Sequence, residues 1–124
     1  MKKYMLIALI CILIDQTTKF LAKKYITIST NTGAIFGILQ NQTKLIILLT
    51  FFALGFLIYY TTKIKCPYGF GLVFAGLIGN LLDRLVYGYV IDYIKILTWP
   101  AFNLADIFLV TGVIILIIHL RNKL

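Results

Sequence analysis

Four long apolar segments, separated by polar links, constrain the fold of this chain more than any other feature. They cover residues 4–22, 45–60, 68–86 and 102–120. A helix needs about 20 residues to cross about 30 Å of hydrocarbon, and it satisfies its own backbone hydrogen bonds where water is absent. The sequence therefore predicts an all-α membrane protein with four transmembrane helices.

The composition supports this fold class and leaves little sequence for another domain. Hydrophobic residues make up 61% of the chain and charged residues 13%, whereas about 25% are charged in soluble domains. The net charge of +8 is spread between the apolar segments, without the basic arm or patch typical of nucleic-acid binding. We expect residues 1–124 to form a single integral-membrane domain that contacts membrane lipids but no nucleic acid, and that acts as a monomer.

The basic residues indicate how the helices are oriented. With four crossings, both termini and the link between the second and third helices share one side of the membrane. That side carries six basic residues and the other four, namely Lys2, Lys3, Lys63, Lys65, Arg121 and Lys123 against Lys23, Lys24, Lys44 and Lys95. Because cytoplasmic loops are enriched in lysine and arginine, we expect the N and C termini to be cytoplasmic.

The chain has only four acidic residues, and this topology places all of them near the outer face of the membrane. They are Asp15, Asp83, Asp92 and Asp106. Because an ionised carboxylate in hydrocarbon is costly, an acid kept inside apolar sequence is a functional hypothesis by default. Transporter sites lie nearer the midplane, so the depth of these acids favours a site at the outer boundary over an ion pathway.

Two of the acids have basic neighbours in the sequence. Asp15 and Lys19 are four residues apart, which is the spacing of an ion pair on one helical face. Asp83 is followed by Arg84. We expect the guanidinium group of Arg84 to offset the charge of Asp83 through a network of polar groups. For these two acids we prefer a structural interpretation, in which the ion pairs lock helices together.

Asp92 and Asp106 have no basic residue at helical spacing except Lys95, which we expect to point to the aqueous interface. If their carboxyl groups converge, mutual repulsion and low dielectric raise one pKa, so that the pair holds one proton at neutral pH. One group then acts as base and the other as acid, as in aspartic proteases. Spacing alone leaves open whether this pair does chemistry or only holds helices together.

Four sequence blocks around the acids resemble the lipoprotein signal peptidase family, also called signal peptidase II. They are DQTTK at 15–19, NTGAIF at 31–36, GNLLDRLVYGYVIDY at 79–93 and FNLAD at 102–106. The resemblance implies an aspartic endopeptidase of the bacterial cytoplasmic (inner) membrane with its active site near the extracytoplasmic face. Its substrates would be diacylglyceryl-modified prolipoproteins, from which it would remove the signal peptide by cutting before the lipid-modified cysteine.

The same blocks imply which residues form the site. The family's catalytic aspartates match Asp92 and Asp106. Other matching residues have substrate-binding or supporting positions: Asn31, Asn80, Arg84, Asn103, Asp15, Lys19, Asp83 and Gly33. Asn31 could equally be a turn residue. We expect no metal or other cofactor, because the single histidine lies at the wrong depth and neither cysteine is close to the acids.

One departure from the family affects the substrate contacts. Asp15 and Asn31 are only sixteen positions apart, whereas the family usually has a longer segment that builds a small extracytoplasmic sheet. We therefore expect only a small β element after the first helix, and substrate contacts there that differ from those of the family. Without the resemblance, two other functions compete: a transporter, which depends on an ion gradient, and a lipid-binding scaffold, which tolerates replacement of the acidic pair.

Overall fold

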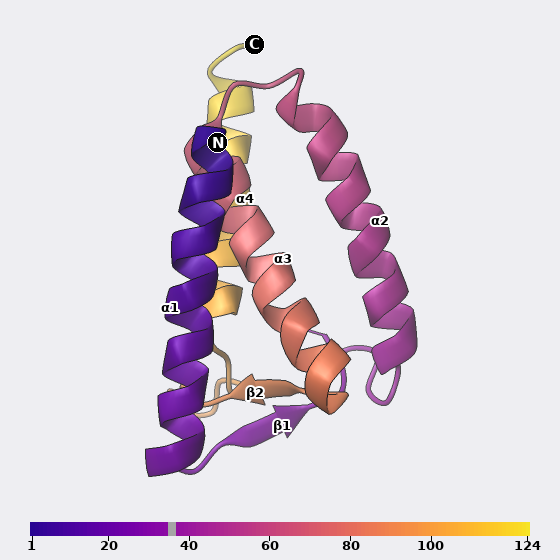
Figure 1. Cartoon of the computed structure of the whole chain (residues 1–124), viewed down its shortest axis with the longest axis vertical. Coiled ribbons are helices and arrows are strands. Elements are labelled where there is room, and N and C mark those ends of the chain that lie inside the picture. Colours follow the sequence, from indigo (N-terminus) through magenta and orange to yellow (C-terminus); the bar gives the residue numbers. More distant parts are fainter. Residues whose placement is uncertain (35–36) are drawn as a thin grey trace.

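The computed structural model describes residues 1–34 and 37–124, which form four long helices and two short strands (Figure 1). In chain order these elements are α1 (Lys3–Tyr25), β1 (Ser29–Asn31), α2 (Thr43–Thr61), α3 (Pro67–Tyr87), β2 (Val90–Asp92) and α4 (Leu104–Arg121). Each helix is long and apolar enough to cross a membrane, which confirms the predicted four-helix membrane fold. Both termini lie at the same end of the bundle (Figure 1). Which side of the membrane this end faces stays a prediction.

The helix α3 is the centre of the bundle and is the most buried of the four. It packs against α1, α2 and α4, and its Phe70 and Phe74 form a core with Ala8 of α1. A Cβ atom at Gly76 would lie only 2.5 Å from the carbonyl oxygen of Ala105, so glycine permits the close approach of α3 and α4. The other helices expose most of their apolar side chains, as a surface in contact with lipid does.

A two-stranded antiparallel sheet lies at the end of the bundle opposite the termini (Figure 1). The register of β1 and β2 pairs Ser29 with Asp92, Thr30 with Ile91 and Asn31 with Val90. All three residues of β2 are buried. This sheet confirms the small β element expected after the first helix, although its second strand comes from the link that follows α3.

The start of α4 differs from the prediction by two residues. The helix was expected from residue 102, but it begins at Leu104. Phe102 instead forms an isolated antiparallel bridge with Ile94, and Asn103 is the N-cap of the helix. As a result Asp106 lies in the first turn of α4, beside the sheet.

Candidate active site

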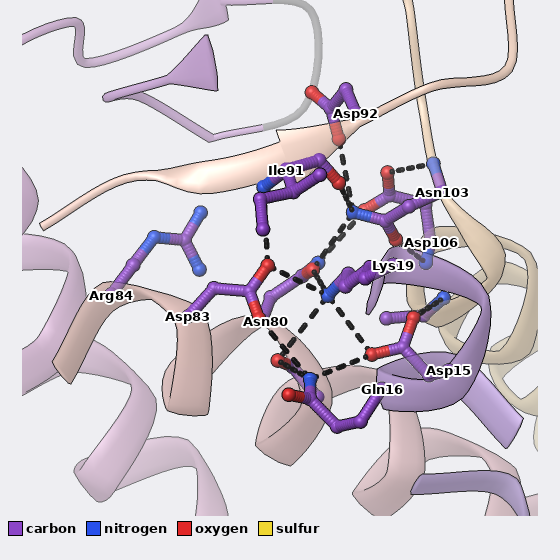
Figure 2. Close-up of polar contacts among 12 residues, drawn as sticks. Asp15, Gln16, Lys19, Asn80, Asp83, Arg84, Ile91, Asp92, Asn103 and Asp106 are labelled. Atoms are coloured by element: carbon purple, nitrogen blue, oxygen red, sulfur yellow. Dashed lines mark hydrogen bonds and ion pairs between the residues drawn. The ribbon is translucent and has the colours of Figure 1, made fainter. Parts of the chain in front are cut away.

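The four acidic side chains gather at the end of the bundle that carries the sheet (Figure 2). They come from α1, α3, the last position of β2 and the first turn of α4: Asp15, Asp83, Asp92 and Asp106. The first three expose only 0%, 1% and 3% of their surface, and the fourth is partly buried. In the described part of the chain, no three or more His, Cys, Asp or Glu side chains form a group that could hold a metal ion.

Lys19 joins two of these acids in a buried cluster. Its Nζ lies 2.9 Å from Oδ2 of Asp15 and 3.0 Å from Oδ2 of Asp83, and only 2% of Lys19 is exposed. The pair of Lys19 with Asp15 was predicted. Asp83 and Arg84 form no direct ion pair within the described residues, because adjacent residues on a helix point in different directions, and the two groups interact only through their charges. Nη2 of Arg84 instead donates to the carbonyl oxygen of Gly33 at 2.9 Å.

Backbone and amide donors complete the hydrogen bonding of Asp15 and Asp83. The backbone N–H of Ala105 donates to Oδ1 of Asp15 at 2.9 Å, and that of Ile91 donates to Oδ2 of Asp83 at 3.1 Å. Gln16 donates from Nε2 to both carboxylates, at 3.2 and 3.1 Å. These acids thus connect α1 to α4 and α3 to β2, which supports their structural interpretation. Gln16 was not predicted, although its position inside the DQTTK block was a signal.

Asp92 and Asp106 are linked by amides and form no ion pair within residues 1–34 and 37–124. Asn103 donates from Nδ2 to Oδ1 of Asp92 at 2.9 Å, and its Oδ1 accepts from the backbone N–H of Asp106 at 2.9 Å. Nδ2 of Asn80 donates to Oδ1 of Asp106 at 2.9 Å. One fully buried side chain, Asn103, therefore contacts both members of the predicted pair.

Both members of this pair also line one cavity of about 600 Å³. Its apolar wall is formed by the link before α4 and by α4 itself, through Trp99, Pro100, Ala101, Phe102, Ile107 and Val110. A smaller cavity of about 220 Å³ contacts the two acids together with Asn31, Asn80 and Arg84. Three of the eight residues that the resemblance assigned to supporting positions thus line a cavity together with Asp92 and Asp106.

The surroundings of Asp92 favour its protonated form. Burial and, next, the negative charge of Asp106 raise the pKa of Asp92 to about 7, because both disfavour the charged form. Hydrogen bonding by Asn31 and Asn103 and the charge of Lys19 act in the opposite direction. A carboxyl group with a pKa near neutrality can donate or accept a proton at little cost at neutral pH.

Asn31 ends β1 and shapes the turn that follows. Its Oδ1 accepts from the backbone N–H of Gly33 at 2.9 Å, and its Nδ2 donates to the carbonyl oxygen of Ala34 at 3.1 Å. A Cβ atom at Gly33 would lie 2.5 Å from the carbonyl oxygen of Ile38, so the turn needs glycine. Asn31 is therefore a turn residue that also lines the larger cavity. The last two residues of the NTGAIF block, 35 and 36, lie outside the described residues.

Sequence comparisons with known proteins agree on one family. The family described as Signal peptidase (SPase) II matches residues 7–122. The lipoprotein signal peptidase of Halothermothrix orenii is 36% identical, covering 95% of this chain and 94% of the relative. That of Caldanaerobacter subterraneus subsp. tengcongensis is 39% identical, with coverages of 85% and 86%. Two solved bacterial membrane enzymes are each 30% identical to this chain. One superposes with a TM-score of 0.89 over 97% of this chain and 88% of its own. The other superposes with a TM-score of 0.83 over 94% of this chain and 91% of its own.

Proposed function

This chain belongs to the signal peptidase II family, and on that premise we propose that it is an intramembrane aspartic endopeptidase with Asp92 and Asp106 as its catalytic pair. The observation that carries the proposal is that both carboxyl groups line one cavity and contact the same asparagine, Asn103. Unlike Asp15 and Asp83, neither is neutralised by a cation within the described residues. The pair is therefore the part of the acidic cluster that is available for proton transfer.

The proposed reaction is hydrolysis of a peptide bond by a water molecule held between the two carboxyl groups. At neutral pH the pair carries a single proton. The ionised group takes a proton from the water as it attacks the carbonyl carbon, and the protonated group donates to the carbonyl oxygen. Asn103 and Asn80 hold the carboxyl groups in position, which matters because a displacement of about 1 Å can cost about 100-fold in rate.

We assign the substrate from the relatives, which are named lipoprotein signal peptidases. The chain removes signal peptides from diacylglyceryl-modified prolipoproteins by cutting before the lipid-modified cysteine. The cavity suits such a substrate, because Phe102, Ile107 and Val110 line it beside the acids and provide an apolar wall for acyl chains. We expect lipidated substrate to be cleaved in preference to the unlipidated form, and equal cleavage of both would contradict this assignment.

The protein resides in the bacterial cytoplasmic membrane, with cytoplasmic termini and the site near the extracytoplasmic face. The sheet lies at the end of the bundle opposite the termini, and the acids lie beside it. The excess of basic residues lies with the termini. Leu97, in the link before α4, is 99% exposed. In intact cells, a Leu97→Cys variant of the protein should react with a membrane-impermeant thiol reagent, and a Lys123→Cys variant should not. The opposite labelling pattern would show the opposite orientation in the membrane.

A processing assay tests the proposed function. Purified protein in detergent is incubated with a lipidated prolipoprotein, and cleavage is followed by the shift of the product on a gel. We expect wild-type protein and a Thr61→Ala control, changed at the far end of α2, to cleave without any ion gradient, which a transporter would require. Asp92→Asn and Asp106→Asn should fold but not cleave. Retained processing in either would favour a scaffold role for the acids.

A further inference from the structure

Lys19 is one of two donors that fix the orientation of the Asn80 side chain, and Asn103 is the other. The ammonium group of Lys19 carries only donors, and it donates to Oδ1 of Asn80 at 3.1 Å (Figure 2). The Asn80 amide must therefore direct its Nδ2 elsewhere, and Nδ2 donates to Oδ1 of Asp106 at 2.9 Å. An inverted amide would place its NH₂ group against the ammonium group.

Asn103 is oriented by a second group that can only donate. The backbone N–H of Asp106 donates to Oδ1 of Asn103 at 2.9 Å, so Nδ2 of Asn103 points to the other side of the amide. There it faces three acceptors: Oδ1 of Asp92 at 2.9 Å, Oδ1 of Asn80 at 3.0 Å and the carbonyl oxygen of Ile91 at 3.2 Å. Because two hydrogens serve three acceptors, Asp92 shares this donor with its neighbours.

The two carboxyl groups are therefore hydrogen-bonded unequally. Both oxygens of Asp106 accept a bond, Oδ1 from Asn80 and Oδ2 from the backbone N–H of Asn103 at 3.1 Å. Asp106 also lies in the first turn of α4, where the helix dipole favours a negative charge. Asp92 lies at the end of a strand, shares the Asn103 amide, and interacts with the amide of Asn31, which also binds a backbone carbonyl.

The surrounding charges disfavour ionisation of both members of the pair. Two cations are close to it, Lys19 from α1 and Arg84 from α3. Two further carboxylates, Asp15 from α1 and Asp83 from α3, offset these cations. Because the cations are already offset, ionisation of both members of the pair would place two uncompensated negative charges next to each other in a buried site, which costs more than one such charge. The pair therefore retains one proton.

We propose that Lys19 is a positioning residue: through Asn80 it selects Asp106 as the ionised base and leaves the proton of the pair on Asp92. This inference rests on the proposed peptidase activity and adds to it the role of each acid. Lys19 does not line the 600 Å³ cavity, so it acts through Asn80 and not by contact with substrate.

Each proton in the reaction then has a defined route. Asp106 takes a proton from water, the water oxygen bonds to the carbonyl carbon, and the carbonyl oxygen takes the proton of Asp92, giving a neutral tetrahedral diol. Asp106 next delivers its proton to the leaving nitrogen as the C–N bond breaks, and Asp92 recovers a proton from a diol hydroxyl. A carboxylic acid and an amine leave, and the pair returns to its starting state.

The acid content of the chain makes the assignment directly measurable. Its four acidic residues are all aspartates and it has no glutamate. Aspartate labelled with ¹³C at Cγ therefore gives four side-chain carboxyl signals, each identified by its loss in one Asp→Asn variant. In detergent at pH 6, we expect the ¹³C chemical shift of Asp106 to be that of an ionised carboxylate and the shift of Asp92 to be that of a protonated carboxyl group. The reverse assignment, or equal intermediate shifts for both, would overturn the inference.

Variants of Lys19 and Asn80 test the positioning role. In Lys19→Gln only Asn103 still directs a donor at Oδ1 of Asn80, so the orientation of Asn80 is less strictly enforced, and the positive charge that lowers the pKa of Asp92 is lost. We expect the Asp106 signal to move toward the protonated position and the alkaline decline of kcat/KM to shift to higher pH. Asn80→Ala keeps both ion pairs of Lys19 and should give the same movement of the Asp106 signal, with kcat about 10-fold to 100-fold lower.

These measurements separate the inference from the proposed function. An Asn122→Ala control beyond α4 should leave all four signals and the pH profile unchanged. A merely structural role for Lys19 and Asn80 predicts less folded protein with unchanged signals in the folded fraction, and this outcome would overturn the inference. Cleavage by Asp92→Asn or Asp106→Asn would contradict the peptidase mechanism, whatever the positions of the signals.

Discussion

Asn103 and Asp106 bond each other twice at the start of α4. Oδ1 of Asn103 accepts from the backbone N–H of Asp106 at 2.9 Å, and Oδ2 of Asp106 accepts from the backbone N–H of Asn103 at 3.1 Å. This reciprocal arrangement is a capping box. Because Asn103 also donates to Asp92, the residue that begins the helix also sets the geometry of the acidic pair.

The two roles of Asn103 can be separated by substitution. Asn103→Ala removes both the cap and the donor, and we expect a loss of about 0.5–2 kcal/mol in the free energy of unfolding together with loss of cleavage. Asn103→Ser keeps an oxygen that can cap the helix but has no NH₂ group to reach Asp92. Thermal unfolding should show recovered stability in Asn103→Ser, while the gel-shift assay shows no recovery of cleavage. Full activity of Asn103→Ser would contradict the role of this donor.

The pKa of Asp92 predicts how activity depends on pH. It is raised to about 7, so the protonated form prevails below this value and the ionised form above it. If Asp92 supplies the acid of the reaction, kcat/KM should fall as pH rises through about 7, by about 10-fold per pH unit well above it. Circular dichroism over the same range controls for unfolding. A rate that increases steadily through pH 7 to 9 would contradict an acid role for Asp92.

Gly79 gives a steric test of the contact between α1 and α3. A Cβ atom there would lie 2.6 Å from Oδ2 of Asp15, so Gly79→Ala must displace a buried carboxylate. We expect a loss of about 1–3 kcal/mol in stability and reduced cleavage, because Asp15 is paired with Lys19. Gly55→Ala is the matched control, since nothing lies within 4 Å of its added Cβ. Equal losses of stability in Gly79→Ala and Gly55→Ala would show that the contact of Gly79 with Asp15 is not tightly packed.

Lys19 should be important for stability as well as for orientation. Removing it leaves Asp15 and Asp83 buried without their cation, and breaking a buried ion pair in this way costs about 3–5 kcal/mol. We expect Lys19→Met to lower the unfolding temperature in detergent strongly. Lys24→Met, an exposed lysine of the same helix, should have little effect. Similar unfolding temperatures for both variants would refute the importance of this cluster.

Most of the fold could be predicted because spanning helices follow local hydrophobicity. The four predicted segments coincide with α1 to α4, and their ends differ by at most three residues. The start of α4 was the instructive difference. Phe102 is apolar enough to continue a helix, but it pairs with Ile94 through a tertiary contact that hydropathy does not register.

The candidate site could be predicted as a set of residues but not as a network. Asp92 and Asp106 were predicted as the catalytic pair because they lack basic partners nearby in the sequence and because they match the catalytic positions of the family. The contact of Lys19 with Asp83 joins α1 to α3, and no local spacing indicates it. The cap of α4 was not predicted either, although the spacing of Asn103 and Asp106 is a capping signature that can be recognised in the sequence.

We propose that Asp92 and Asp106 act as one catalytic unit, and the cleavage rates of single and double variants can decide this. Initial cleavage rates of lipidated prolipoprotein should be measured for Asp92→Asn, Asp106→Asn and the double variant, each shown to be folded. Because groups that act together are strongly non-additive, we predict that each single variant loses as much activity as the double variant. Substantial cleavage by either single variant, with a further multiplicative loss in the double variant, would contradict the claim.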